Sequence, residues 1–176
     1  MAIVVREARA SDVEYIVELE RSCFDAPSCE ARKVHEERVK VFSPGFLIME
    51  KDGDVVGMIS SEIWDVKSEP DESFFTLGHS ISELHSEDGN ELYLSNFCVF
   101  PKYRGSGYGK ILFNTLLSRI KISYPRLREA ALIVSEDWGA ARHIYSGRGF
   151  EIDRVIPEFF TANDGKHNGL VMKKTL

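Results

Sequence analysis

The stretch Arg104-Gly105-Ser106-Gly107-Tyr108-Gly109-Lys110 decides how the rest of this sequence folds. It lies between an apolar segment at 91–100, which predicts a β-strand, and a segment at 108–120 whose apolar residues recur at helical spacing. Its glycines let the backbone turn tightly and approach a ligand closely. The free amide groups and the dipole of the following helix favour a phosphate there, so the stretch predicts an anion site.

The spacing of the glycines excludes two common phosphate loops. A Walker A loop has four residues between its glycines and then Gly-Lys-Ser/Thr, and the Rossmann fingerprint is G-x-G-x-x-G. The glycines here stand at 105, 107 and 109, with Arg104 and Lys110 adding positive charge at the same end of the helix. The sequence therefore predicts an anion site of a different kind.

Strand-like and helix-like segments alternate on either side of this stretch. Asp52-Gly53 is a strong hairpin signal between strands at 46–50 and 55–64, so the sheet is not purely parallel. We expect one α+β domain over residues 1–176, with a central mixed, mostly antiparallel sheet and helices on both faces. The remaining predicted strands are 3–8, 91–100, 130–134, 150–156 and 170–173, and the remaining predicted helices are one after a capping box at 11–14, one from about 28 that ends before 43, and one at 138–145.

Residues 66–90 are polar and predict a long loop, which in a compact domain is usually functional or mobile. The formal net charge of −6 and the isoelectric point near 5.4 argue against nucleic acid as a partner. No apolar run approaches the ~20 residues of a membrane span, and the start lacks the build of a signal peptide, so we expect a cytoplasmic protein. The three cysteines lack CxxC spacing, which predicts reduced, mostly buried thiols and no metal site.

Two motifs in the right order resemble the GCN5-related N-acetyltransferases. Arg104-x-x-Gly107-x-Gly109 is similar to the family's phosphate-binding signature, and Ala141-x-x-Ile144-Tyr145-x-x-x-Gly149-Phe150 is similar to a second segment some thirty residues on. The resemblance covers essentially the whole chain. It implies a transfer of the acetyl group of acetyl-CoA to a primary amine by direct attack in a ternary complex.

The resemblance also implies roles for particular residues. The backbone of Phe97, Cys98 and Val99 would pair with the pantetheine arm, and residues Arg104, Gly105, Ser106, Gly107, Tyr108, Gly109 and Lys110 would hold the pyrophosphate. Tyr145 stands where the family carries the tyrosine that donates a proton to the departing thiolate. Members often carry Asn seven residues before this tyrosine, and this chain has Trp138 there.

On the acceptor side the chain is similar to the arylalkylamine (serotonin-type) N-acetyltransferases around residues 61–65 and 84–93. The His-x-His pair of that group corresponds to Tyr93 and Ser95 here. Glu91, Tyr93 and Ser95 share one strand face, which predicts a water chain ending on Glu91, with Glu62 as the alternative carboxylate. By position, the acceptor pocket would be lined by Phe24, Asp25, Pro27, Phe159 and Phe160.

Three functions remain open from the sequence. The first is acetylation of a small amine, and the second is acetylation of a protein or peptide at its N-terminus or at a lysine. The third is a non-catalytic module that binds acyl-CoA. The resemblance is also compatible with a homodimer.

Overall fold

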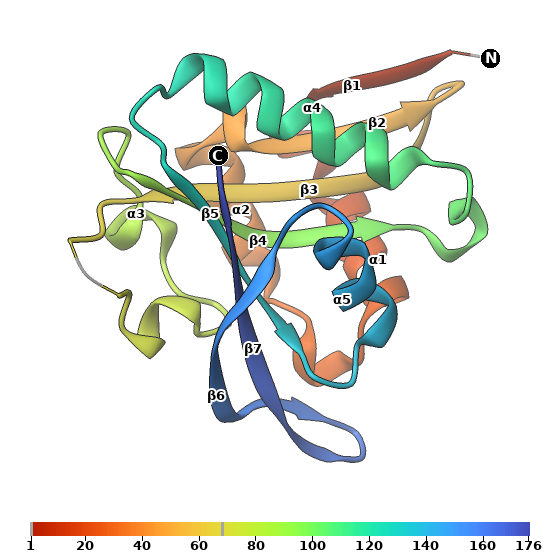
Figure 1. Cartoon of the computed structure of the whole chain (residues 1–176). Helices are drawn as coiled ribbons and strands as arrows, with labels where there is room; N and C mark the ends of the chain where they lie inside the picture. Colours follow the sequence, from red (N-terminus) through yellow and green to blue (C-terminus); the bar gives the residue numbers. More distant parts are fainter. Residues whose placement is uncertain (1, 68) are drawn as a thin grey trace.

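A computed structural model describes residues 2–67 and 69–176 as a seven-stranded sheet with the order β1-β2-β3-β4-β5-β7-β6 (Figure 1). In the described sheet β4 and β5 are parallel, and every other neighbouring pair is antiparallel. This confirms the predicted mixed, mostly antiparallel sheet. The strands are β1 Ile3–Glu7, β2 Phe46–Lys51, β3 Asp54–Trp64, β4 Glu91–Val99, β5 Glu129–Ser135, β6 Glu151–Ala162 and β7 Gly165–Thr175.

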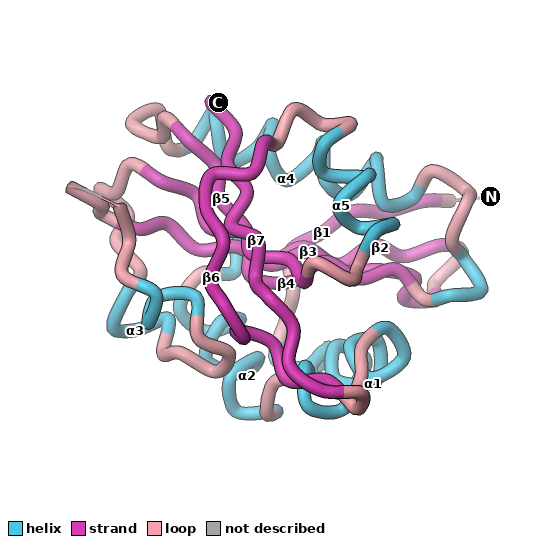
Figure 2. The backbone as a smooth tube through the Cα atoms, turned by 60° about the horizontal axis from the view of Figure 1, so that its bottom comes forward, coloured by secondary structure: helices cyan, strands magenta, loops and turns pink. Residues whose placement is uncertain are grey.

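Helices cover both faces of the sheet, as predicted (Figure 2). Side chains alternate along β2, so Leu47 and Met49 join the cluster beneath α4, whereas Phe46 and Ile48 join the cluster beneath α1 and α2. No helix among the described residues is long and apolar enough to cross a membrane. The helices are α1 Val13–Cys23, α2 Arg32–Val41, α3 Ile81–Leu84, α4 Tyr108–Ser123 and α5 Gly139–Ser146.

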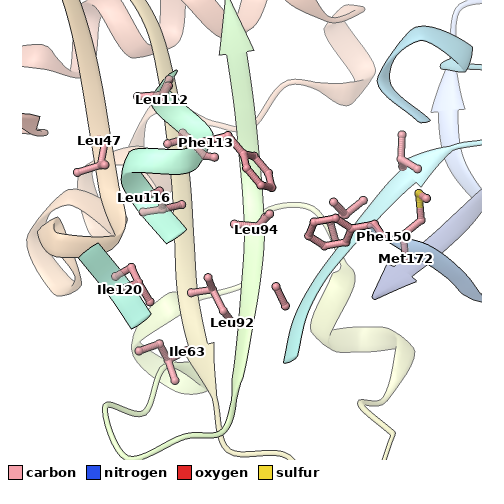
Figure 3. Close-up of a cluster of buried hydrophobic side chains, with 14 of the residues drawn as sticks. Leu47, Ile63, Leu92, Leu94, Leu112, Phe113, Leu116, Ile120, Phe150 and Met172 are labelled. Atoms are coloured by element: carbon pink, nitrogen blue, oxygen red, sulfur yellow. The ribbon is translucent and has the colours of Figure 1, made fainter. Parts of the chain in front are cut away.

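The largest core cluster lies between α4 and the sheet (Figure 3). Leu112, Phe113 and Leu116 point from one face of α4 onto β3 and β4, and Ile120 lies next to Ile63 farther along the helix. Burying a side chain of this size stabilises a fold by about 1.5–3 kcal/mol. This packing fixes the start of α4, and with it the glycine loop, against the end of β4.

The predicted hairpin at Asp52-Gly53 is present, and β6 and β7 form a second hairpin that the sequence did not predict. Asp52 and Gly53 both have positive φ, 52° and 95°, as the tight turn between β2 and β3 requires. The strands predicted at 150–156 and 170–173 are β6 and β7, which continue to the turn between Ala162 and Gly165. The hairpin projects from the body of the sheet (Figure 1). Its far part therefore carries many polar residues, which obscure the alternation that identifies a strand.

Two local predictions are wrong. The predicted loop at 66–90 contains a short 3-10 helix, Glu72–Phe75, and α3. The many Ser, Asp and Glu residues of this segment obscure the spacing of its few buried residues. Residue 68 lies outside the described residues. The predicted capping box at 11–14 does not form. Instead the Asp12 carboxylate accepts the amide of Arg9 at 2.7 Å, because the Arg6 guanidinium holds that carboxylate at 2.7 and 2.8 Å.

Packing of α4 against the sheet predicts a sharp contrast between two substitutions in one helix. Leu116 is fully buried, so Leu116→Ala is expected to lower the free energy of unfolding by about 2–5 kcal/mol. Ile122 is 81% exposed, so Ile122→Ala is expected to change it by less than ~0.5 kcal/mol. Urea denaturation measures both, and equal effects would contradict this packing.

Candidate active site

Strands β4 and β5 pair at one end only. Their register pairs join Glu91–Tyr93 to Glu129–Ala131, and from there the two strands separate (Figure 1). β5 continues along β7 instead, while β4 runs on alone at this edge as far as Val99. Backbone N–H and C=O groups need partners, so the separated part of β4 offers a strand edge to a ligand.

A bulge in β4 lies at the point of separation. Ser60 pairs with Asn96 and Ser61 pairs with Leu94, which leaves Ser95 as the extra residue. The hydroxyl groups of Ser95 and Ser60 form a hydrogen bond, with 2.7 Å between their oxygens. A bulge re-aims the side chains on either side of it. Here Phe97 turns toward the α4 face while Asn96 and Cys98 turn toward α1.

A cleft of about 670 Å³ opens beside the separated part of β4. Its walls include the end of β4, the glycine loop, the C-terminal end of α1 and one side of α5. Of the residues predicted to bind the cofactor, Ser106 is not part of the lining. The predicted residues that do line the cleft are Phe97, Cys98, Val99, Arg104, Gly105, Gly107, Tyr108, Gly109 and Lys110.

The glycine loop has the geometry of a phosphate cradle. Gly105 and Gly107 have φ of 79° and 80°, which side-chain-bearing residues rarely adopt, and a Cβ at either position would meet no atom within 4 Å. Gly107 directly precedes α4, whose first amide groups have no partner within the helix. Those donors and the empty space beside them fit an anionic group such as the pyrophosphate of coenzyme A.

Positive charge surrounds the same loop. Arg104, Lys110 and Arg148 all line the cleft, against Asp25 and Asp137. The Arg104 side chain donates from Nε to the carbonyl oxygen of Val99 at 3.1 Å, so it bridges the loop and the end of β4. The electrostatic balance of the lining favours an anion at this end of the cleft.

Tyr145 of α5 lies where this cleft meets a second, smaller cavity of about 110 Å³. Its ring centroid is 6.5 Å from that of Phe97 and 6.0 Å from that of Phe150. Burial raises the pKa of the Tyr145 hydroxyl, so it keeps its proton at neutral pH. The residues that line both cavities are Phe24, Ser28, Phe97, Trp138, Ala141 and Tyr145.

The second cavity combines buried carboxylates with apolar walls. Glu20 of α1 and Glu30 line it together with Tyr93 and Ser95. The apolar walls are Phe24, Leu77, Leu94, Phe97, Leu132, Ile133, Val134, Trp138, Ala141 and Phe160. Carboxylates in such surroundings attract a cation, because the low local dielectric strengthens the attraction.

Each of these carboxylates is held by buried partners. Glu20 accepts the Asn96 amide at 2.7 Å, the His35 ring at 2.9 Å and the backbone amide of Glu30 at 3.0 Å. The Glu30 carboxylate accepts hydrogen bonds from both terminal nitrogens of Arg38. Ligand atoms of Glu20, Glu30 and His35 lie within 4.8 Å of one another, but the fork of Arg38 occupies both oxygens of Glu30, so the arrangement suits an ion-pair network better than a metal.

Behind Tyr93 lies a second acid–base pair. Tyr93 faces Glu62 across the β3–β4 pair and stacks on Trp64 at 4.2 Å between ring centroids. Glu62 accepts hydrogen bonds of 2.6 Å from the Trp64 indole and from the His79 ring. Burial opposes a charge on His79, but the bond to Glu62 outweighs it and raises the pKa of His79. The predicted alternative carboxylate Glu62 thus lies one strand away from the cavity.

The structure does not bring Glu91 to the cavity. Glu91 lies at the opposite end of β4, and Lys173 Nζ is 3.3 Å from its Oε2. Burial raises the pKa of Glu91. Glu91 lines neither cavity, and it lies four residues before Ser95, or about 13 Å along an extended strand. Tyr93 and Ser95 line the second cavity, and Glu91 does not.

The aromatic residues expected near the acceptor are divided. Phe24 and Phe160 line the second cavity, and Trp138 lies between them, with ring centroids at 5.1 and 5.0 Å. Asp25 lines the larger cleft, whereas Pro27 and Phe159 line neither. Trp138 therefore lines the junction of the two cavities with its ring, at the position where the family often carries Asn.

Sequence reasoning missed Glu20, Glu30 and Asn96. Glu20 stands four residues after Ile16, on the apolar face of α1, so a carboxylate on a core-facing position was the available signal. Arg38 also stands on the inner face of α2, and a buried Arg requires a carboxylate partner. Nothing local identifies that partner as Glu30.

Comparison with known proteins gives the family. The model of the acetyltransferase (GNAT) family matches residues 13–150. An uncharacterised N-acetyltransferase of Bacillus subtilis (strain 168), YkwB, is 29% identical over 123 residues, which are 65% of this chain and 54% of that protein. The match thus spans about half the length of that relative.

Two further similarities extend over the full length. A putative ribosomal protein bS18-alanine N-acetyltransferase of the same organism is 23% identical over 98% of this chain and 95% of that protein. The crystal structure of Ard1 from Thermoplasma volcanium shares the fold, with a TM-score of 0.78 and 19% identity over 100% of this chain and 99% of that one. On the family match, and with the separated strands and glycine loop in place, the chain belongs to the GNAT family of acetyltransferases.

Proposed function

We propose that this protein transfers the acetyl group of acetyl-CoA to a primary amine, and that the amine is small. The observation that carries the proposal is the meeting of the two cavities at Tyr145. One cavity has a phosphate cradle and a free strand edge, and the other has buried carboxylates. An acyl donor and a cationic acceptor bound in this way meet at a single tyrosine.

Different residues of the cleft bind different parts of the acetyl-CoA donor. The amides at the start of α4, with Arg104 and Lys110, hold the pyrophosphate, and the backbone of residues 97–99 pairs with the pantetheine arm. Acetyl-CoA supplies an activated thioester. Fixing both ends of the donor places its reactive group at the junction and lowers the entropic part of the barrier.

Tyr145 is suited to the role of general acid. Its hydroxyl is protonated at neutral pH because burial raises its pKa. In the proposed reaction the hydroxyl donates its proton toward the sulfur as the thiolate leaves. The rings of Phe97 and Phe150 pack near the Tyr145 ring and hold its side chain in position.

Glu20 is the proposed partner of the acceptor ammonium. A carboxylate about 4 Å from an ammonium attracts it by about 4 kcal/mol at an effective dielectric of about 20. Arg38 already compensates Glu30, which leaves Glu20 as the lining carboxylate without an arginine or lysine partner among the described residues. Tyr93 and Ser95 would order the water that takes the proton from the ammonium, with Glu20 in place of Glu91 at its end.

The size of the acceptor cavity supports a small amine. About 110 Å³ of space lies between Leu77, contributed by residues 66–90, and Phe160 of β6. The amide of Gly78 donates to Glu30 at 3.0 Å and so ties residues 66–90 over this side of the sheet. A short amine with an apolar body fits these walls.

The second candidate acceptor is a peptide α-amine. It is favoured by one observation, the full-length similarity to a protein named as a putative ribosomal protein alanine N-acetyltransferase. A peptide would have to enter between Leu77 and Phe160 with its N-terminus toward Glu20. A non-catalytic module is the weaker alternative, because Tyr145 lies at the junction where a proton donor is needed.

The phosphate cradle is tested by Gly107→Ala. The methyl group would project into the open space beside the loop, so the affinity for acetyl-CoA is expected to fall by about tenfold or more, or ~1.4 kcal/mol. Affinity for acetylated pantetheine, which lacks the pyrophosphate, is expected to stay within about twofold, or ~0.4 kcal/mol. Calorimetry measures both.

Gly53→Ala is the matched control for the backbone strain. Gly53 also has a positive φ, 95°, with no atom near its Cβ position, but it lies in the β2–β3 turn. This variant is expected to bind acetyl-CoA like the parent. Equal losses in Gly107→Ala and Gly53→Ala would assign the effect to strain and contradict the cradle.

The role of Tyr145 is tested by Tyr145→Phe, which removes only the hydroxyl. Turnover is expected to fall by roughly ten- to ten-thousandfold, the range for one general acid, while the dissociation constant of acetyl-CoA stays unchanged. Steady-state kinetics and calorimetry separate the two effects. Turnover within about twofold of the parent would make Tyr145 a packing residue.

The acceptor class is tested with a panel of short primary amines and hexapeptides. A small amine is expected to give the highest kcat/KM, and a better peptide substrate would replace the small-amine proposal by its alternative.

With the best substrate, Glu20→Gln is expected to raise KM by about tenfold or more, since it removes the attraction to the ammonium. Glu91→Gln, a buried carboxylate outside both cavities, is the control; a change in its pH profile alone would restore Glu91 as the proton acceptor.

A further inference from the structure

A tight turn at residues 76–79 carries part of the wall of the second cavity. Its first and last residues are joined by a backbone hydrogen bond of 3.2 Å, from the His79 amide to the Thr76 carbonyl oxygen. Gly78 has a φ of 78°, the left-handed conformation that favours glycine at this position of a turn. Leu77, the residue before it, lines the second cavity. The geometry of this turn therefore decides where that part of the wall lies.

Packing alone does not hold Leu77 in place. The residue is 40% exposed, and it belongs to none of the buried hydrophobic clusters of the described residues. A side chain that stays partly in water gains less of the burial energy that fixes core residues. The position of Leu77 therefore depends on the hydrogen bonds that hold its turn.

Two of these hydrogen bonds reach the α2 side of the molecule. The Gly78 amide donates to Glu30 Oε1 at 3.0 Å. The hydroxyl of Ser80, directly after the turn, donates to Glu37 of α2 at 2.6 Å. Both donors are neutral groups that keep their proton at neutral and moderately alkaline pH, so these two bonds do not titrate there.

The third bond is made by the ring of His79 and depends on a proton. Nε2 lies 2.6 Å from Oε1 of Glu62 on β3, and Nδ1 lies 2.9 Å from the carbonyl oxygen of Thr76. The Glu62 side chain is fully buried and that of His79 is 7% exposed, so the ring anchors the turn in the interior. A carboxylate and a carbonyl are both acceptors, so the ring satisfies both only as an imidazolium. Loss of either proton leaves a nitrogen lone pair against an oxygen, and one of the two bonds is lost.

The groups around His79 favour the doubly protonated ring. Burial lowers the pKa of His79, but the hydrogen bond to Glu62 and the charge of Glu62 outweigh burial and raise it, while Arg38 of α2 opposes them. The charge of Arg38 is itself paired with Glu30. Tyr93 of β4, with its ring centroid 6.0 Å from that of His79, is neutral because burial raises its pKa. His79 therefore keeps its second proton to higher pH than a free imidazole, and loses it as the pH rises through this raised pKa.

We propose that His79 is a positioning residue of the acceptor site: its imidazolium, bound to Glu62, holds Leu77 in the wall of the second cavity, and loss of the proton releases this wall and weakens amine binding. The effect on the amine rests on the proposed function, because that function places the acceptor in this cavity. His79 acts through Leu77, since it lines neither cavity itself. The affinity for acetyl-CoA is therefore expected to stay the same.

The dependence of the turn on the proton is tested without any substrate. NMR follows the ring nitrogens of His79 from pH 5.5 to 9 and measures the protection of the Gly78 amide against hydrogen exchange, corrected for the intrinsic rate. We expect His79 to titrate above the ordinary value of about 6.5, and the protection of Gly78 to fall over the same pH interval by about fivefold or more. A midpoint at or below about 6.5, or protection of Gly78 that stays constant through the titration, would overturn the proposal.

The effect on the acceptor is tested with isopentylamine, a short amine with an apolar body, at pH 6 and at pH 9. His79→Gln is the comparison, because its side-chain amide donates to Glu62 at both pH values and does not titrate. Relative to this variant, KM of the parent for the amine is expected to rise by about fivefold or more from pH 6 to pH 9, with kcat following the same profile in both proteins. The titration of the amine itself affects both proteins equally.

Two further variants sharpen this test. His79→Ala lacks both ring bonds, so it is expected to show the high KM at both pH values. His143→Gln replaces an exposed histidine of α5 that lines neither cavity, and it is expected to follow the parent. A pH dependence of KM that disappears in His143→Gln as well as in His79→Gln would contradict a role specific to His79.

The kinetic outcomes separate this inference from the proposed function. Turnover of isopentylamine with the same pH dependence of KM in the parent and in His79→Gln refutes the positioning role and leaves the acetyl transfer intact. Failure of the parent to acetylate isopentylamine or another short amine of the panel refutes the small-amine proposal, and the role of His79 in amine binding falls with it.

Discussion

The separation of β4 from β5 is the constraint on which the site depends. The two strands share three register pairs and then part, so a central strand of the sheet has an edge that no other strand of the described residues pairs. That edge is stable only because both flanks are packed: α4 covers one face of β4, and α1 covers the other. Only a short 3-10 helix, Pro101–Tyr103, separates β4 from the glycine loop, so the strand edge and the loop line one cleft.

A buried polar network connects this surface to the second cavity. The Cys98 thiol donates to Asn96 Oδ1 at 3.1 Å, Asn96 donates to Glu20, and Glu20 is held by His35. Buried charges of this kind cost free energy unless each is paired. Here they set the position of the Glu20 carboxylate in the wall of the second cavity, which Tyr145 also lines.

How much could be predicted depended on whether the signal was local. The glycine loop, the Asp52-Gly53 turn and the segment around Tyr145 are short motifs, and the structure places all of them as the sequence indicated. Glu20 and Asn96 are 76 residues apart, so no local pattern joins them. Glu91 illustrates the limit of strand periodicity, which gives the face of a residue but not its distance along the strand from the site.

The central claim is that the amides of the glycine loop and of the free β4 edge bind acetyl-CoA. Amide hydrogen exchange measures this most directly, because it follows those groups themselves. The account predicts that saturating acetyl-CoA slows exchange at residues 97–99 and 105–110 and leaves the turn at Asp52 and Gly53 unchanged. Exchange at 105–110 that is the same with and without acetyl-CoA would contradict it.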